Sequence, residues 1–445
     1  MSISNKLFPF LITLLSFLLV IPAGAAYSQE NFKAAFARTN ITPDTPKNLL
    51  GYSPRMSEGV RDSIYHKVVI LDDGYKQFYL VATDLGVIAP VTYDKAAARL
   101  KKMFNIDRDN FWWSNTHTHS APEVGSGGVI PLFLGERYEQ KFDEPYARFV
   151  EDKLVEAIAE ARKKLVPAKL GAGWGYSRAN INRRARDVNN KTFLGENPDA
   201  PVDRKIGLLR IETADGKPMA LIANYPIHGT VLAISDTRIS GDVPGVVAQY
   251  VEEQTGAPLL FVNGALGNIA PRFSVPGYNV GKKDGPLRQF RKLLGEPILE
   301  ANNRILATTG TVKLKTSGIV IETPRREDIK TWTNDMKDYL RISGAGTALI
   351  RMPIQFLGIN DDIMIWSAPC ELFCEISNEI RNNSPYPYTF YAGITNGTFG
   401  YLCTEEEIKL GGYEPTVSPF SPSAAKDLSE GVSRHLDQLS RKSKP

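Results

Sequence analysis

The chain has 445 residues, of which 42% are hydrophobic and 23% charged, so its composition is that of a globular protein with a large core. Its net charge of +4 is too small to indicate a nucleic-acid partner. The three cysteines, Cys370, Cys374 and Cys403, are too few for a disulfide framework in a protein of this size. One disulfide with an odd thiol, or a metal role for Cys370 and Cys374, stays open.

The first 25 residues differ from the rest of the chain. Lys6 lies in a short polar start, the apolar run "LFPFLITLLSFLLVIP" follows, and Ala23-Gly24-Ala25 has the small residues of a processing site. We predict a cleaved export signal at residues 1–25, which places residues 26–445 in the periplasm or outside the cell without stable membrane insertion. An uncleaved membrane anchor is the alternative.

From residue 31 onward, strand and helix patterns alternate. Alternating apolar residues predict hairpins at 66–88 and 206–229, which turn at Asp72-Asp73-Gly74 and at Ala214-Asp215-Gly216-Lys217. We predict further strands at 110–120, 258–267, 361–369 and 386–394, and helices at 93–104, 146–165, 244–254, 286–305, 326–340, 370–383 and near the end of the chain.

No Pro/Gly/Ser-rich linker separates large blocks of this pattern. The sequence therefore predicts a single domain over residues 26–445, of the α/β class, with mixed β-sheets flanked by helices.

Two of the five histidines stand one residue apart in "NTHTHS". In an extended strand, the side chains of His117 and His119 point to the same face, which suits a metal site. His228, in "NYPIHGTVL", again follows an apolar strand. A hydrolytic zinc site needs three or four nitrogen or oxygen ligands and an open position for water. Histidines that only satisfy buried carbonyl groups are the alternative.

Six segments in chain order resemble the catalytic domain of the neutral, non-lysosomal ceramidase family. They are "FARTNITPDTPKNLLGY", "NTHTHSAPE", "NINRR", "NYPIHGTVLAISDTRISGDVPG", "APCELF" and "NGTFGYLCTEEEIKLGGYEP". The resemblance implies that fold and a zinc-dependent hydrolase that uses metal-activated water on an amide or ester bond.

Residue by residue, the resemblance implies that zinc is bound by His117, His228, Glu371 and Tyr413. It makes His119 a group that contacts the substrate or assists proton transfer, and Arg183 a group that steadies a substrate oxygen. Without the resemblance, Glu371 is interpreted as a carboxylate favoured at a helix N-terminus, and Tyr413 as a surface aromatic residue.

The chain departs from the family pattern after residue 266. Where the family has Gly-Asp-Val-Ser-Pro-Asn, this chain has Gly-Asn268-Ile-Ala270-Pro-Arg272. Ala270 has no hydroxyl group that could attack or donate a hydrogen bond. Arg183, Arg184 and Arg186 in "NRRARD" suit a carboxylate, sulfate or phosphate, or else form a solvated loop. The apolar loop at 127–135 is a further candidate, either as a shield for an acyl chain or as ordinary core.

Three functions are consistent with the motifs that this chain shares with the family and with the positions where it differs. The first is a zinc-dependent hydrolase acting on a polar or anionic small molecule rather than on ceramide. The second is a carbohydrate-active enzyme, either a deacetylase or a lyase or dehydratase, acting on oligosaccharides that contain uronic acid or sulfate. In the lyase or dehydratase, zinc and Arg183 would neutralise the uronate carboxylate, and His119 or Tyr413 would be the catalytic group that moves the proton. The third is a binding protein without catalysis, which retention of all four implied ligands disfavours.

Overall fold

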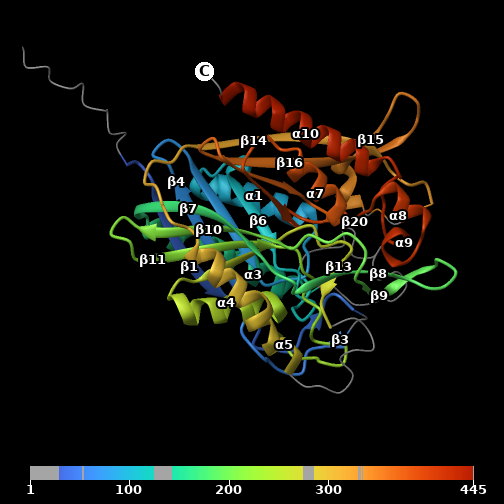
Figure 1. Ribbon diagram of the computed structural model, residues 1–445, viewed down its shortest axis with the longest axis horizontal. Helices are drawn as coiled ribbons and strands as arrows, with labels where there is room; N and C mark the ends of the chain where they lie inside the picture. Colours follow the sequence, from blue (N-terminus) through green and yellow to red (C-terminus); the bar gives the residue numbers. More distant parts are fainter. Residues whose placement is uncertain are drawn as a thin grey trace, which may run out of the picture.

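The computed structural model describes residues 30–52, 55–124, 143–273, 285–328, 332 and 334–443. Two β-sheets pack face to face, and helices cover the outer face of each sheet (Figure 1). Mixed sheets flanked by helices were predicted, and that prediction is confirmed. The predicted export signal at 1–25 and the apolar loop at 127–135 lie outside the described residues.

The larger sheet has eight strands in the order β12-β11-β10-β7-β1-β4-β5-β6. Its interior pairs are antiparallel, whereas the pairs at its two edges, β11–β12 and β5–β6, are parallel. Both predicted hairpins are confirmed, as β4–β5 and β10–β11. The strand bounds are β12 (Leu259–Asn263), β11 (Pro218–Tyr225), β10 (Lys205–Thr213), β7 (Val166–Tyr176), β1 (Lys33–Asn40), β4 (Tyr65–Asp72), β5 (Gln77–Thr83) and β6 (Phe111–Asn115).

The second sheet has five strands, in the order β14-β16-β17-β19, with β15 paired to β16. Its strands are β14 (Leu314–Pro324), β16 (Ala348–Ile359), β17 (Ile363–Ala368), β19 (Tyr388–Gly393) and β15 (Leu340–Ile342). Three small sheets complete the described strands: β13 (Ile269–Pro271), β8 (Asn180–Arg186) and β9 (Thr192–Asn197); β18 (Glu371–Leu372) and β20 (Tyr401–Leu402); and β2 (Asn48–Leu49) and β3 (Arg55–Met56).

The helices form the two outer layers. Against the larger sheet lie α1 (Pro90–Phe104), α3 (Glu144–Lys163), α4 (Asp242–Thr255), α5 (Gly285–Phe290), η3 (Arg291–Gly295) and α6 (Glu296–Asn303). Against the second sheet lie α7 (Cys374–Asn382) and α10 (Ala424–Ser443). Shorter elements are η1 (Arg108–Asn110), η4 (Asn334–Tyr339), α8 (Glu405–Lys409) and α9 (Tyr413–Thr416). In α3, the Asp143 carboxylate caps the Tyr146 N–H, and one face buries Val150, Leu154 and Ile158.

The prediction of a helix near 326–340 is wrong for the residues of this segment that the structure describes. Only the short element η4 forms there, between strands β14 and β15. Asn334, Asp335 and Asp338 favour local turns because their side chains compete for backbone hydrogen bonds. The helix predicted at 370–383 also begins later, at Cys374, because Glu371 and Leu372 pair with β20.

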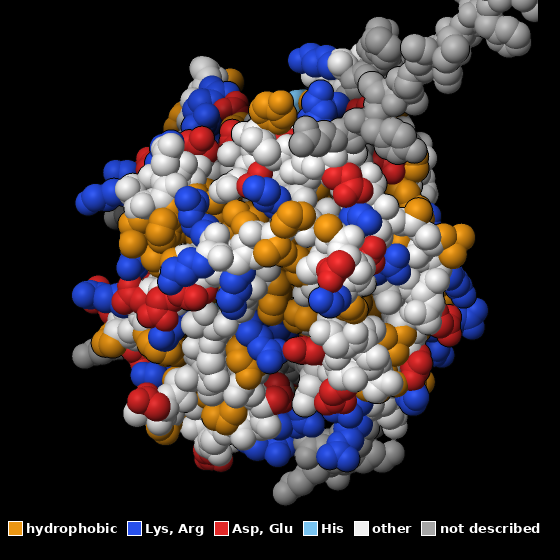
Figure 2. Space-filling view, turned by 90° about the vertical axis from the view of Figure 1, so that its left-hand side faces the viewer, with side chains coloured by type: hydrophobic (Ala, Val, Ile, Leu, Met, Phe, Trp, Pro, Cys, Tyr) orange, Lys and Arg blue, Asp and Glu red, His pale blue; other side chains and the backbone are white. Residues whose placement is uncertain are grey.

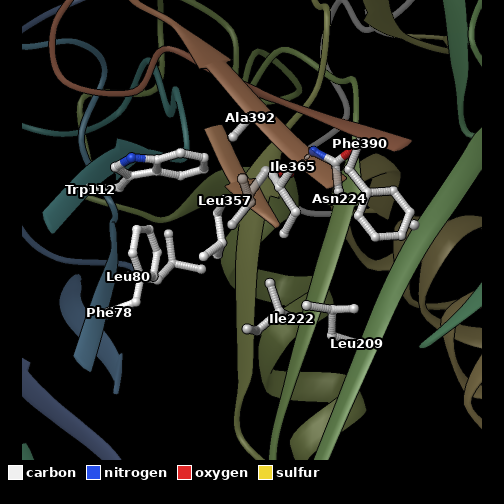
Figure 3. Close-up of a pocket in the computed structure, with 12 residues that line it drawn as sticks. Phe78, Leu80, Trp112, Leu209, Ile222, Asn224, Leu357, Ile365, Phe390 and Ala392 are labelled. Carbon is white, nitrogen blue, oxygen red and sulfur yellow. Dashed lines mark hydrogen bonds between the residues drawn. The ribbon is translucent and has the colours of Figure 1, made fainter. Parts of the chain in front are cut away.

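Apolar side chains from both sheets fill the space between them. Phe78 and Trp112 of the larger sheet face Leu357, Ile365 and Phe390 of the second sheet around a small cavity of about 20 Å³ (Figure 3). The walls of this cavity are almost entirely apolar. An apolar cavity of this size lacks the two to four polar partners that a buried water needs, so we expect it to stay dry.

His66 on β4 is a buried histidine that belongs to this scaffold. Its Nε2 donates to the carbonyl of Val150 at 2.9 Å, and its Nδ1 lies 2.7 Å from the Thr83 hydroxyl. Burial lowers the pKa of His66 from 6.5 to about 4. The folded protein therefore resists protonation of this ring, whereas the unfolded chain does not.

We expect this histidine to make stability depend on pH. Its contribution is complete above about pH 6.5 and is lost as the pH falls through about 4, because the unfolded chain takes up the proton first. The full effect is roughly 3 kcal/mol. Urea unfolding between pH 7 and 4 measures it, with His66→Gln as the comparison. An equally steep loss of stability in His66→Gln would contradict the assignment.

The surface carries charges of both signs. On the face shown in Figure 2, Lys and Arg side chains alternate with Asp and Glu side chains, and hydrophobic side chains form a band between them. Opposite charges placed side by side form local pairs rather than an extended field of one sign. Within the described residues, no helix is both long and apolar enough to cross a bilayer.

Candidate metal centre

The candidate site lies where three parallel strand pairs end. His117 follows β6, His228 follows β11 and Glu371 follows β17, and each of these strands belongs to a parallel pair. In sheets with parallel strands, ligands commonly bind outside the carboxyl ends. The fold therefore brings together three residues that lie far apart in the sequence.

His117 is not on an extended strand, which corrects the prediction from the i, i+2 spacing. Strand β6 ends at Asn115, and His117 has a positive φ of 62°, so the backbone turns there. Hydrogen bonds hold this turn: the N–H of His117 donates to the Leu85 carbonyl at 2.9 Å, and its own carbonyl accepts from Gly229 at 3.1 Å. The two histidine rings still converge, but through a turn rather than through strand alternation.

Hydrogen bonds fix the orientation of both His117 and His228. Nδ1 of His117 lies 2.9 Å from the Gly86 carbonyl, and Nδ1 of His228 lies 2.7 Å from the Ile269 carbonyl. Because a carbonyl only accepts, each Nδ1 carries the proton, and in the neutral ring each Nε2 presents a lone pair. Histidines that bind metals are commonly held by such a bond from the other ring nitrogen.

The two Nε2 atoms face one carboxylate oxygen. Oε2 of Glu371 lies 3.4 Å from Nε2 of His117 and 3.4 Å from Nε2 of His228. This oxygen is buried and has no hydrogen-bond partner in the described part of the chain. The two Nε2 lone pairs and this carboxylate oxygen are three electron-pair donors that converge, an arrangement that a cation would complete. The residues therefore fit a zinc ion, which takes nitrogen and carboxylate ligands.

The charges around this group are strongly coupled. Burial and the nearby Arg183 charge lower the pKa of His228 to about 3, so this ring is neutral at pH 7. A neutral imidazole beside an ionised carboxylate is the state that binds a metal.

His119 differs from the other two histidines. Its Nε2 lies 3.3 Å from Nε2 of His117, and one nitrogen from each of the three histidines fits within 4.8 Å of the others. Its Nδ1, however, is buried without a hydrogen-bond partner among the described residues. His119 thus lacks the supporting bond that fixes His117 and His228. The structure brings the predicted His119 to the site, while its role as a proton carrier stays a prediction.

Arg183 reaches the site from β8, as predicted. Its Nη1 donates to Nε2 of His228 at 2.9 Å, its Nη2 donates to the Tyr401 hydroxyl at 3.1 Å, and its Nε donates to Glu414 at 2.7 Å. The Tyr401 and Glu414 contacts outweigh burial, so Arg183 stays charged. A buried positive charge therefore faces the group of donors.

The rest of the arginine cluster is paired within the protein. Arg184 is only 2% exposed and bonds to Glu414 and Glu407, each at 2.5 Å. Arg186 pairs with Glu407 at 3.0 Å. These residues lie on strand β8, so they do not form the solvated loop that the sequence left open. Arg184 is already paired with carboxylates of the protein, so it is not free to bind an anionic ligand. Arg272 differs: no carboxylate among the described residues pairs with it, and its guanidinium lies over the Phe273 ring at 5.1 Å.

Tyr401 is the phenol that sequence reasoning missed. Its side chain is buried, and its hydroxyl contacts both Arg183 and the Glu371 carboxylate. Tyr413, the implied fourth ligand, is 36% exposed and lies edge-on to the Tyr401 ring at 5.8 Å. Tyr401 and Tyr413 both lie in the segment "NGTFGYLCTEEEIKLGGYEP". Only the pairing of β20 with β18, which places Tyr401 beside Glu371, distinguishes the two tyrosines, and the sequence does not show that pairing. Tyr413 as a ligand stays a prediction.

Asn268 and Ala270 flank Ile269, whose carbonyl accepts from Nδ1 of His228. Ala270 is 5% exposed on β13 and pairs with Ile181. The Asn268 amide donates to both oxygens of Glu375, at 3.0 and 2.8 Å, and its Oδ1 accepts from the Cys374 N–H at 3.0 Å. Asn268 therefore ties β13 to the start of α7, next to Glu371, through a carboxyl group that the sequence did not single out.

All three cysteines are free and buried. Cys370, Cys374 and Cys403 form no disulfide, so the single pair left open by the sequence does not occur. They also stand outside the histidine group that could hold a metal among the described residues. Burial raises the pKa of Cys370 to about 12, which keeps it a neutral thiol.

This fold and this group of donors define a candidate metal-binding protein built on two packed mixed sheets. Residues 32–265 match the family described as neutral/alkaline non-lysosomal ceramidase, N-terminal. The chain belongs to this family. The predicted resemblance is thereby confirmed.

Individual relatives agree with the family assignment. The neutral ceramidase of Pseudomonas aeruginosa is 26% identical over 300 residues, covering 62% of this chain and 43% of the relative. Neutral ceramidase A of Dictyostelium discoideum is 30% identical over 231 residues, covering 48% of this chain and 30% of the relative. The aligned part of the chain thus spans less than half of these relatives. The crystal structure of the Pseudomonas aeruginosa enzyme superposes with a TM-score of 0.73 at 19% identity, covering 93% of this chain and 75% of that one, and shows the shared fold.

Proposed function

We propose that this chain is an exported, zinc-dependent hydrolase that cleaves an amide or ester bond in a polar or anionic small molecule. The observation that carries the proposal is the buried, unpaired Oε2 of Glu371 at 3.4 Å from two Nε2 atoms. His117, His228 and Glu371 would hold the metal, and the Tyr401 hydroxyl beside Glu371 is the nearest candidate for a fourth donor. When bound, zinc lowers the pKa of water and polarises a carbonyl group.

The other residues supply positioning and proton transfer. His119 has a ring nitrogen at the group of donors and no bond that commits its other nitrogen, so it suits a proton carrier. Arg183 presents guanidinium N–H groups beside His228, where they can hold a carbonyl oxygen. Ala270 supplies no hydroxyl, so no covalent step through this position enters the reaction.

The preference for a polar or anionic substrate rests on the departures from the family. The serine is replaced by Ala270, and Arg272 stands three residues after Ile269, whose carbonyl holds His228. The Arg272 guanidinium lies over the Phe273 ring, and a guanidinium at the edge of the site would suit an anionic group. The same feature suits a uronate, so elimination by a carbohydrate lyase or dehydratase is the second candidate.

A substrate panel tests the proposal. Zinc-loaded protein is incubated with a fluorescent short-chain ceramide, N-acyl amino acids, acetylated sugars and uronate oligosaccharides, with chelator-treated protein as the control. We expect chelator-sensitive release of an acid from the anionic amides or esters, well above release from ceramide. A new conjugated double bond in the uronates, without hydrolysis, would instead establish the lyase. Efficient cleavage of ceramide alone would overturn the substrate class.

A further inference from the structure

Residues 50–52, the described part of the loop that follows β2, and Arg55 at the start of β3 lie against His119. Gly51 has a φ of 117°, and a Cβ atom built on it would lie 2.6 Å from Nδ1 and 2.7 Å from Cβ of His119. The Tyr52 ring meets the His119 ring edge-on, at 5.0 Å between centroids. Nη2 of Arg55 donates to the His119 carbonyl at 2.6 Å. Gly51 and Tyr52 of the loop and Arg55 of β3 therefore all contact this single histidine.

The loop itself is held at both sides of the site. The Leu50 N–H donates to the Ala121 carbonyl at 3.0 Å, next to the histidine turn. The Tyr52 hydroxyl donates to the Leu232 carbonyl at 3.1 Å, in the segment that follows His228. The Arg55 guanidinium lies over the Tyr52 ring at 4.8 Å. The loop is thus tied to the segments that carry both His117 and His228.

We propose that Gly51 and Tyr52 are positioning residues that set the orientation of the His119 ring. This inference rests on the role proposed above for His119. Hydrogen bonds from Nδ1 fix His117 and His228, whereas Nδ1 of His119 has no such bond in the described structure. Packing must therefore fix this ring. Only glycine leaves room for the ring at residue 51, and only glycine adopts this φ without strain.

The chain offers a matched control for this inference. Gly59 has the same φ of 117°, but a Cβ atom there would meet nothing within 4 Å. Gly51→Ala and Gly59→Ala therefore both place an alanine at the same strained φ, and only Gly51→Ala pushes on His119. Tyr52→Leu removes the ring contact without backbone strain, so it serves as a second variant if Gly51→Ala does not fold.

For each variant, the NMR resonances of the histidine rings and the amount of bound zinc are measured at one fixed pH. The kcat and KM are then measured with the best substrate. The chain has five histidines, which single substitutions can assign. We expect Gly51→Ala and Tyr52→Leu to move the His119 resonances and leave zinc bound, while Gly59→Ala moves nothing. A displacement of about 1 Å costs roughly 100-fold, so we expect kcat to fall by that factor with KM nearly unchanged.

A double mutant separates positioning from general structural damage. In a His119→Ala background, Gly51→Ala should cost no further activity, because its effect passes through His119. Unmoved His119 resonances in both Gly51→Ala and Tyr52→Leu would overturn the positioning role. If the His119 resonances move but activity stays full, Gly51 and Tyr52 do position the ring, but His119 takes no part in the proposed reaction. The experiment therefore distinguishes failure of the positioning role from failure of the proposed role of His119.

Discussion

The Glu414→Ala variant is expected to lose about 3–5 kcal/mol of its free energy of unfolding, the largest effect on stability that we predict. Glu414 is 1% exposed and bonds to Arg183 at 2.7 Å and to Arg184 at 2.5 Å. Removing this carboxylate leaves two buried guanidinium groups facing each other with one partner fewer each. The penalty arises from buried unpaired charge rather than from loss of attraction at a surface.

Denaturant unfolding followed by circular dichroism measures this loss. The matched control is Glu405→Ala, which removes an exposed glutamate that pairs with Lys409 at 2.7 Å on α8. Exposed pairs of this kind contribute little to stability, so the control should unfold almost like the original protein. Equal stability of the two variants would show that the Arg183–Glu414–Arg184 cluster is solvated rather than buried.

The Glu371→Gln variant is expected to lose at least about 100-fold in zinc affinity, and activity with it. Among the described residues, Glu371 supplies the one carboxylate oxygen that lies 3.4 Å from both His117 and His228. An amide keeps the shape of the side chain but removes the negative charge that faces the cation. Loss of one partner from a buried charge pair costs about 3 kcal/mol or more, which is roughly 100-fold in affinity.

Equilibrium dialysis against buffered zinc measures the affinity of this variant. Glu379→Gln is the control, because it makes the same chemical change on the exposed side of α7, eight residues further along. We expect Glu379→Gln to bind zinc normally. Unchanged zinc binding by Glu371→Gln would place the metal elsewhere and remove Glu371 from the site.

Local patterns in the sequence predicted the scaffold well. Hairpins β4–β5 and β10–β11 formed as expected because apolar alternation and Asp-Gly turns determine them over a few residues. The prediction of a helix near 326–340 was wrong, because Asn and Asp residues that favour turns outweigh a weak helical pattern there. Boundaries at the site shifted as well: β6 ends at Asn115, and Glu371 pairs with β20 instead of starting a helix.

Contacts between distant segments explain what sequence reasoning missed at the site. His117, His228 and Glu371 were found from histidine spacing and family resemblance, and the fold brings them together. Tyr401 was missed because it and Tyr413 stand 12 residues apart in one resembling segment, and only the β18–β20 pairing shows which phenol is buried beside Glu371. The Asn268–Glu375 bond joins residues 107 positions apart, which no local pattern indicates.

In the proposed centre, His117, His228 and Glu371 hold one metal while His119 stays outside the ligand set. Metal analysis of the reconstituted His119→Ala and His117→Ala variants distinguishes this ligand set from one that includes all three histidines. The arrangement predicts about one zinc per chain in the original protein and in His119→Ala, and almost none in His117→Ala. Loss of zinc from His119→Ala to the same extent as from His117→Ala would contradict it and make all three histidines ligands.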